Sequence, residues 1–263
     1  DVLVTYNWGA IEAALANRFW PVARHVHVED GFGPEEAAGR QLRRRVLMRR
    51  LALSGRTRIL VPSRTLERVA TETWGFDPRR VRWIPNGIDC QQLDASAAAV
   101  AGARPPGEKP VVGTIATLRP EKNLGVLLKA FLRVADQADG LVIAGDGPER
   151  AALQAEAGRL GLADRVSFIG HVDPAALFGR IDVFALSSDT EQMPYSVIEA
   201  MACGLPVAAT DVGDLRAMLG TDNARYLVPP GHPDRLAAAI GDLLASPGTR
   251  AALGRSNRAR AQS

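Results

Sequence analysis

The stretch EQMPYSVIEAMACGLPVAATD, residues 191–211, encodes a loop, a helix and a strand in succession, and the rest of the chain is interpreted around it. Pro194 suits the first turn of a helix, where a missing N–H costs nothing, and Gly204 suits the turn that ends it. Glu191 stands in the loop, and Glu199 stands about 1.5 turns into the helix, given about 3.6 residues per turn. The N–H groups at such a helix start attract an anion. A ligand with a phosphate and hydroxyl groups on either side, such as a nucleotide sugar, would fit this unit.

Size and composition are those of an ordinary globular chain. It has 263 residues, of which 46% are hydrophobic and 23% charged, which is enough for one large or two medium domains. Its two cysteines, Cys90 and Cys203, lie far apart, which indicates no disulfide framework and favours a reducing cytoplasm. No apolar run reaches the ~18 residues of a membrane span, and no signal peptide is visible. We expect a cytoplasmic protein, with peripheral contact at the inner face of the membrane as an open alternative.

The net charge of +3 hides a strongly basic window. Eight arginines lie from Arg40 to Arg58, and no acid interrupts them. On a helix these side chains would point nearly all round, so no amphipathic stripe is predicted. The window is either a solvated surface helix or a surface that attracts anionic lipid head groups or a phosphorylated acceptor. Nucleic acid is disfavoured because no aromatic residues interleave with the arginines.

Short apolar runs alternate with helical segments along the whole chain. This alternation predicts an α/β fold of parallel sheets with helices on both faces. Residues 91–110 are rich in alanine, glycine and proline and interrupt the rhythm, so we expect a linker there. We therefore expect an incomplete first domain over residues 1–90 and a second domain over 111–263. The predicted strands are 2–6, 25–29, 59–62, 81–85, 111–116, 141–144, 166–169, 183–186, 207–210 and 226–228, and the predicted helices are 11–18, 35–53, 65–74, 124–138, 149–160, 174–178, 195–203 and 233–245.

Two further motifs follow strands of the second domain, where doubly wound sheets bind their ligands. In TLRPEKN, residues 117–123, Arg119 and Lys122 would project toward the strand ends and could hold a diphosphate. In AGDGP, residues 144–148, Gly145 and Gly147 allow a tight turn and a close approach of backbone to ligand. It is not a dinucleotide fingerprint, because Arg150 stands where the third glycine should be. The alternative for residues 117–123 is a solvated basic loop, and the alternative for residues 144–148 is an ordinary strand–helix turn.

The first domain offers one candidate, HVHVEDGFG, residues 25–33. His27 and Glu29 would share one face of a strand, with Asp30 at its tip. Such groups could contact a sugar hydroxyl or transfer a proton, although a purely structural histidine is the alternative. The four histidines show no metal-ligand spacing, and the two cysteines stand alone, so no metal site is predicted.

Together these motifs resemble a known family. The run 191–211, with GDGP (145–148), RPEKN (119–123) and PNGID (85–89), is similar to the retaining glycosyltransferases of family 4. That family has two facing Rossmann-like domains, the GT-B fold. Residues 190–214 look closest to sugar transferases of bacterial exopolysaccharide clusters.

The resemblance implies a role for each site residue. Arg119 and Lys122 match the basic pair on the donor diphosphate, Glu199 matches the acid on the ribose hydroxyls, and Glu191 matches the acid beside the donor sugar. His27 matches a first-domain histidine near that sugar. The loop that matches the backbone N–H donors to phosphate and sugar consists of Met193, Pro194, Tyr195, Ser196 and Val197.

The implied reaction moves a sugar from a UDP- or GDP-sugar to a hydroxyl group of a saccharide or lipid-linked acceptor with retention of configuration, in polysaccharide or glycolipid synthesis. It needs no cofactor and no bound metal, and the leaving diphosphate helps to deprotonate the acceptor. A sugar-nucleotide epimerase of similar fold and a non-catalytic nucleotide-sugar binding module remain alternatives. The glycine-rich first loop of the family is missing, so we expect a fragment that lacks its N-terminal part and need not be active alone.

Overall fold

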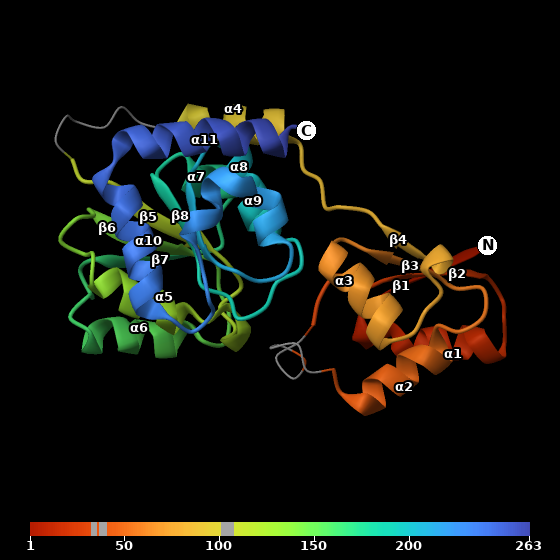
Figure 1. Ribbon diagram of the computed structural model, residues 1–263. Helices are drawn as coiled ribbons and strands as arrows, with labels where there is room; N and C mark the ends of the chain where they lie inside the picture. The colour runs from red at the N-terminus through yellow and green to blue at the C-terminus, as the bar shows by residue number, and fades with distance from the viewer. Residues whose placement is uncertain (33–35, 37–40, 101–107) are drawn as a thin grey trace. The chain divides into compact units, whose positions relative to one another are not determined.

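The computed structural model describes residues 1–32, 36, 41–100 and 108–263. The chain forms two compact units, each with its own parallel sheet (Figure 1). The first unit contains Asp1–Asn86 and two later segments, Thr190–Met193 and Gly213–Leu215. The second contains Gly87–Asp189, Pro194–Val212 and Arg216–Ser263.

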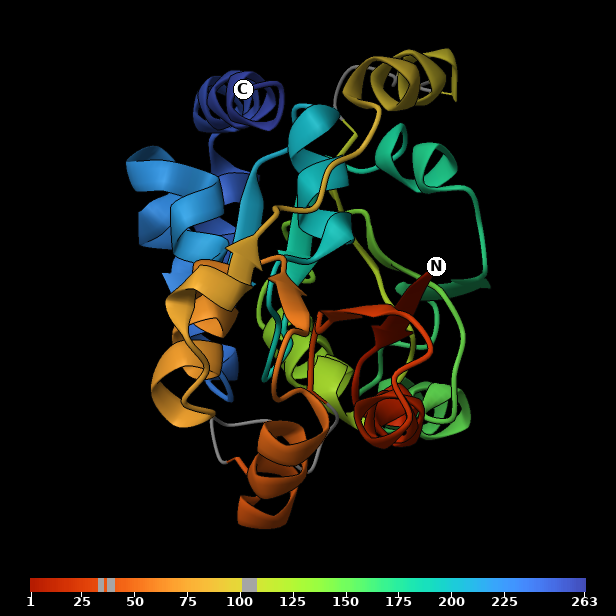
Figure 2. The ribbon, with the colours of Figure 1, turned by 90° about the vertical axis from the view of Figure 1, so that its right-hand side faces the viewer.

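The sheet of the first unit has four parallel strands in the order β1-β2-β3-β4. Helices α1 and α2 pack against each other, and Figure 2 shows α1 (red) nearly end-on beside α2 (orange). The core closes around Trp74, which is fully buried and meets Phe32 and Phe76 edge-on. The elements are β1 (Val2–Tyr6), α1 (Ile11–Phe19), β2 (Arg24–Val28), α2 (Arg43–Ala52), β3 (Arg58–Val61), α3 (Arg64–Arg68) and β4 (Val81–Trp83).

The sheet of the second unit has six parallel strands in the order β10-β9-β8-β5-β6-β7. Strands β8 and β9 are buried at every position, as expected for central strands covered on both faces. The strands are β5 (Val111–Ile115), β6 (Gly140–Ala144), β7 (Val166–Gly170), β8 (Val183–Leu186), β9 (Val207–Thr210) and β10 (Leu227–Val228).

Helices cover both faces of this second sheet (Figure 1). One layer contains α5, α6 and α10, and the other contains α4, α7, α8 and α11. None of the helices in the described part combines the length and the apolarity needed to cross a bilayer. The helices are α4 (Cys90–Val100), α5 (Leu124–Leu132), α6 (Arg150–Arg159), α7 (Pro174–Phe178), α8 (Tyr195–Ala202), α9 (Leu215–Asn223), α10 (Pro233–Ala245) and α11 (Pro247–Ala261).

The winding of the second sheet reverses beside β5. From β5 the chain continues through β6 to β7, and then it crosses back to β8, which pairs with β5 on the other side. From β8 it continues outward through β9 to β10. The carboxyl ends of β5 and β8 therefore form a topological switch point, the place where open α/β sheets bind ligands.

Two expectations are corrected by the structure. The linker expected over 91–110 instead begins with helix α4, which packs on α7 and α8, while its residues 101–107 lie outside the described part. The helix expected over 35–53 is observed from Arg43 to Ala52, and residues 35 and 37–40 lie outside the described part. Helices α9 and α11 have no counterpart among the predicted elements.

Candidate functional site

The turn after β5 presents the two predicted cations of the second unit. Leu118 is fully buried and anchors the turn, whereas Arg119 beside it is exposed. A single 3-10 turn, Pro120–Lys122, follows and ends at Asn123, whose φ of 45° lies in the left-handed region. Helix α5 starts at Leu124, immediately after Asn123, so both cations lie within four residues at the carboxyl edge of the sheet.

The loop after β8 holds this turn in place. The backbone N–H of Asp189 donates to the carbonyl of Glu121 over 2.9 Å, and the carboxylate of Asp189 accepts from the side chain of Asn123 over 2.8 Å. The hydroxyl of Ser187 donates to the carbonyl of Lys122 over 2.9 Å. The two loops at the switch point are thus fixed to each other. Sequence reasoning missed these contacts, because nothing in the order of residues pairs position 123 with position 189.

The glycine turn after β6 packs on the other side of the same segment. A Cβ atom at Gly145 would lie 1.9 Å from the carbonyl oxygen of Ala116, and one at Gly147 would lie 2.5 Å from that of Leu118. The N–H of Gly147 donates to the carboxylate of Asp146 over 2.7 Å. The structure therefore gives both glycines a packing role, and contact of either with a ligand stays a prediction.

Helix α8 follows the loop after β8. Pro194 is its N-cap residue, and no side chain of the described residues caps it. Tyr195 is 52% exposed, whereas the side chain of Val197 is buried in the core. The N–H of Val197 donates to the carbonyl of Pro194, so the N–H groups that a helix start leaves available are those of Tyr195 and Ser196. Gly204, with φ at 70°, ends the helix as its sequence predicts.

Glu199 sits on α8 and is half-buried. Burial, with a smaller contribution from the carboxylate of Asp173, raises the pKa of Glu199. A carboxylate with an unfavourable desolvation energy is ready to accept hydrogen bonds from a ligand's hydroxyl groups. Asp173, which caps α7 through the N–H of Ala175, is a neighbour that the sequence did not point to.

Glu191 and Met193 belong to the first unit by their contacts. Gln192 between them accepts a hydrogen bond from the hydroxyl of Ser63 over 2.7 Å, and the carbonyl of Met193 accepts one from the side chain of Asn86 over 2.8 Å. The carboxylate of Asp214 accepts from the backbone N–H of Thr65 over 3.0 Å. The structure thus places Arg119, Lys122 and Glu199 in one unit and Glu191 in the other, and their convergence stays a prediction.

His27 is fully buried in the first unit. Its Nδ1 lies 2.8 Å from the hydroxyl of Thr5, and its Nε2 lies 3.4 Å from the carboxylate of Glu29. The same Thr5 hydroxyl lies 2.8 Å from Nε2 of His25. Contact of His27 with a substrate would require the ring to leave these partners, so the structure favours a supporting role for it.

Arg49 continues this buried network on the other side of Glu29. It is 1% exposed, and its guanidinium donates to Glu29 and Glu36 over 3.2–3.3 Å. Its charge also lies 4.7 Å from the ring centre of Trp74. Burial alone would lower the pKa of Arg49, but the two carboxylates outweigh it and raise that pKa. The basic window from Arg40 to Arg58 is therefore not a uniform surface, because one of its arginines is a core residue.

Comparison with known proteins identifies the family. Residues 99–260 match the model of the glycosyl transferases group 1, and residues 1–92 match the model of glycosyltransferase family 4. The chain therefore belongs to the glycosyl transferases group 1 family.

Several named relatives have similar sequences. A D-inositol 3-phosphate glycosyltransferase of Segniliparus rotundus is 32% identical over 203 residues, which are 73% of this chain and 45% of that protein. A 2-deoxystreptamine glucosyltransferase of Streptomyces kanamyceticus is 30% identical over 66% of this chain and 47% of its own length. The chain thus spans about half the length of the relatives it matches.

Solved structures share the architecture. Sucrose-phosphate synthase from Thermosynechococcus elongatus superimposes with a TM-score of 0.84 at 26% identity, over 99% of this chain and 68% of that one. Anabaena HepE in complex with UDP superimposes with a TM-score of 0.82 at 22% identity, over 98% of this chain and 73% of that one. These similarities confirm the predicted α/β fold of GT-B glycosyltransferases, with its Rossmann-like domains.

Proposed function

We propose that the chain binds the nucleotide-diphosphate part of a sugar donor at the switch point of its second sheet. The observation that carries this proposal is the hydrogen-bonded pair of loops after β5 and β8, which holds Arg119 and Lys122 in one short turn at the carboxyl edge. Two cations fixed in that way suit the closely spaced charges of a diphosphate. Family membership supports the same ligand class.

In this proposal the reaction is transfer of the sugar to an acceptor hydroxyl with retention at the anomeric carbon. The bond between that carbon and the diphosphate oxygen breaks, and the acceptor oxygen forms its bond on the same face. The acceptor proton passes to the departing diphosphate. Arg119 and Lys122 stabilise the negative charge that collects on that group as it leaves, which is electrostatic catalysis by preorganised donors.

The other predicted residues take binding roles. Glu199 would accept hydrogen bonds from the ribose hydroxyls, and the N–H groups of Tyr195 and Ser196 would face phosphate or sugar oxygens. Glu191 would lie beside the donor sugar. His27 would act through Glu29 and not by contact, because its ring is enclosed.

The finer parts of the function rest on the sequence resemblance. They are the retaining outcome, a role in polysaccharide or glycolipid synthesis, and independence from a metal ion. The base of the donor is open between uridine and guanosine, and one relative, 32% identical over 65% of this chain, is a GDP-mannose-dependent mannosyltransferase of Mycolicibacterium smegmatis.

Calorimetric titration of the 263-residue chain with UDP and with GDP tests the proposal. We expect one nucleotide to bind, and we expect Arg119→Ala with Lys122→Ala to weaken that binding at least tenfold, since each charged contact contributes about 1.5–3 kcal/mol. Lys129→Ala, an exposed lysine on α5, is the matched control and should leave binding unchanged. Binding of neither nucleotide, or equal binding by the double variant, would refute the proposed site.

A further inference from the structure

Helix α8 ends in a turn that leaves two carbonyl groups without a donor of its own. Each backbone N–H of the turn already donates to a carbonyl of the helix at 2.9–3.0 Å: the donors are Cys203, Gly204 and Leu205, and the acceptors are Glu199, Met201 and Ala200. This is a Schellman turn, which Gly204 allows because its φ lies in the left-handed region. The carbonyls of Ala202 and Cys203 must therefore find their donors outside the turn.

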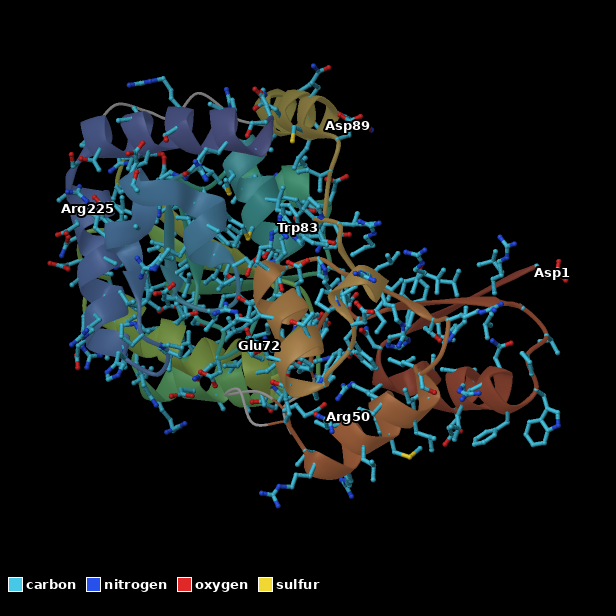
Figure 3. The ribbon with its side chains drawn as sticks, turned by 45° about the vertical axis from the view of Figure 1, so that its right-hand side comes forward. Asp1, Arg50, Glu72, Trp83, Asp89 and Arg225 are labelled. Atoms are coloured by element: carbon cyan, nitrogen blue, oxygen red, sulfur yellow. The ribbon has the colours of Figure 1, made fainter. Side chains whose placement is uncertain are left out.

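Arg258 on α11 supplies both donors. Its Nε donates to the carbonyl of Ala202 over 3.2 Å, and its Nη2 donates to that of Cys203 over 3.1 Å. The same Nη2 donates to the carboxylate of Asp94 on α4 over 2.7 Å, so one guanidinium joins three helices. In Figure 3 the start of α4 is marked by Asp89, which directly precedes the helix. A cation at the carboxyl end of α8 is also favourable for the helix dipole.

Helix α11 approaches the end of α8 closely. A Cβ atom at Gly254 would lie 2.0 Å from the carbonyl oxygen of Gly204, so glycine is required at this contact. The side chain of Asn257, which is fully buried, donates to the carbonyl of Leu205 over 2.8 Å. Gly254, Asn257 and Arg258 are spaced by three and four residues, which places them on one face of α11. That face therefore holds the whole carboxyl end of α8.

We propose that Arg258 is a positioning residue for donor binding, which acts through α8. The helix has only eight residues, Tyr195–Ala202, and Glu199 lies in its last turn. The carbonyl of Glu199 accepts the N–H of Cys203, whose own carbonyl is held by Arg258. Since short helices depend on tertiary contacts for their order, loss of Arg258 would let this last turn fray and displace the carboxylate of Glu199. The inference rests on the function proposed above, which assigns Glu199 to the donor.

A second arginine of α11 makes the same kind of contact with a helix outside the proposed site. Nε and Nη2 of Arg260 donate to the carbonyls of Met218 and Ala217 on α9, over 2.9 and 2.8 Å. These carbonyls precede the kink of α9 at Gly220. The proposed donor site uses no residue of α9, so Arg260 is a matched control for Arg258.

Calorimetric titration of Arg258→Met with UDP and GDP tests the inference. We expect the nucleotide that binds the parent chain to bind about tenfold more weakly, which is roughly the loss of one hydrogen bond to a charged group. Arg258→Lys should bind with intermediate affinity, because lysine keeps the charge but not the planar fork that reaches three acceptors. Arg260→Met should lower the midpoint of urea unfolding, as Arg258→Met does, and leave nucleotide affinity unchanged.

Two further measurements separate positioning from a loss of stability. Burial raises the pKa of Glu199, and release of the end of α8 would hydrate this carboxyl. The pH at which nucleotide affinity falls should therefore move toward the ordinary value of 4.5 in Arg258→Met and stay in place in Arg260→Met. In the ligand-free chain, hydrogen exchange should become faster at residues 195–205 in Arg258→Met and at residues 215–220 in Arg260→Met.

The outcomes distinguish this inference from the donor site on which it rests. Parent-like affinity with an unmoved pH profile in Arg258→Met would overturn the inference, and so would an equal loss of affinity in Arg260→Met. Failure of the parent chain to bind either nucleotide would refute the donor site itself. Hydrogen exchange needs no ligand, so unchanged exchange at residues 195–205 in Arg258→Met would overturn the inference alone.

Discussion

At the scale of single residues, Arg119 and Lys122 carry the proposed chemistry, and their turn is fixed by Asn123, Ser187 and Asp189. In any form of the protein that shows turnover, we expect Lys122→Ala or Arg119→Ala to lower it about 10²- to 10³-fold, because one stabilising contact to the leaving diphosphate is lost. Steady-state kinetics with the donor identified by titration would measure this.

A fold control accompanies that measurement. Neither side chain is buried, so both variants should unfold at the same denaturant concentration as the parent. Asp189→Ala offers a second comparison, since it removes the partner of Asn123 without removing a cation, and we expect a smaller loss of turnover. Undiminished turnover in both alanine variants would remove the catalytic role from this turn.

Glu199 should make both stability and nucleotide binding depend on pH. Its pKa is raised by burial and by Asp173, so the folded state holds the proton more tightly than the unfolded state. The ordinary pKa of a glutamate is 4.5. As pH rises from that value through the higher pKa of Glu199 in the folded state, its ionisation lowers the free energy of unfolding, and the loss persists at higher pH. We expect Glu199→Gln to stabilise the chain near neutral pH while weakening nucleotide binding.

Urea unfolding and nucleotide titration at several pH values would check both parts. In the parent chain, nucleotide affinity should fall as pH drops through the folded pKa of Glu199, because the carboxylate loses an acceptor oxygen. Glu108→Gln, which removes an exposed carboxylate of the same unit, should change neither property. An unchanged pH profile of binding in Glu199→Gln would argue against its contact with the ligand.

At the scale of elements, the approach of the turn after β6 to the segment after β5 sets the shape of the candidate site. Gly145 has φ at 111°, and a Cβ atom there would meet the carbonyl oxygen of Ala116 at 1.9 Å. We expect Gly145→Ala to lower the free energy of unfolding by about 2 kcal/mol or more. Gly158→Ala, on helix α6, should instead raise it by about 0.5–1 kcal/mol, because no described atom outside the adjoining residues and backbone of that helix lies within 4 Å of the added carbon. Equal effects of the two substitutions in denaturant unfolding would contradict this account of the turn.

Local sequence patterns predict most of the helices and strands, and the elements that they miss have identifiable physical reasons. The strands at 183–186 and 207–210 are predicted with their observed bounds, because buried parallel strands appear as continuous apolar runs. Helix α4 is not predicted, because the glycines and prolines that follow it indicate a linker, although alanine, which it contains several times, is the strongest helix former. Helix α11 has start signals of its own, because Ser246 caps it and Pro247 follows at its first position.

The candidate site was predictable to the extent that it follows strand ends. Arg119 and Lys122 could be placed at the carboxyl edge because their motif closely follows a strand, and Glu199 could be placed on a helix. Their contact with a ligand stays a prediction. The enclosure of His27 could not be foreseen, since Thr5 lies 22 residues away in sequence and supplies one of its partners. The contacts of Met193 with Asn86, 107 residues apart, are equally beyond local pattern.

At the scale of the whole molecule, each unit has its own basis of stability, and the first depends on a buried ion network. Arg49→Met should lower the free energy of unfolding by about 3–5 kcal/mol, because the buried carboxylates of Glu29 and Glu36 would both lose Arg49, which leaves Glu36 with Arg45 and Glu29 beside His27. Arg44→Met, at an exposed position of the same helix, should stay within about 0.5 kcal/mol of the parent. Urea unfolding followed by tryptophan fluorescence reports on this unit, since Trp74 stacks on Arg49.

The buried ion pairs of Arg49 also predict that the first unit loses stability in acid. Burial would raise the pKa of Glu36, but the hydrogen bonds and charge of Arg49 outweigh it and lower that pKa below 4.5. Its contribution to stability is thus present above pH 4.5 and disappears as pH falls through the lowered folded value. The difference in free energy of unfolding between the parent and Arg49→Met should therefore shrink as pH falls below 4.5, and a difference that stays constant in acid would contradict this.

The most direct measurement is a crystal structure of the chain with the nucleotide that binds it, UDP or GDP. Our account predicts the diphosphate at the carboxyl ends of β5 and β8, within hydrogen-bond distance of Arg119 and Lys122, with the ribose hydroxyls at Glu199. A nucleotide bound at any other edge of the second sheet, or with its phosphates away from both cations, would contradict it.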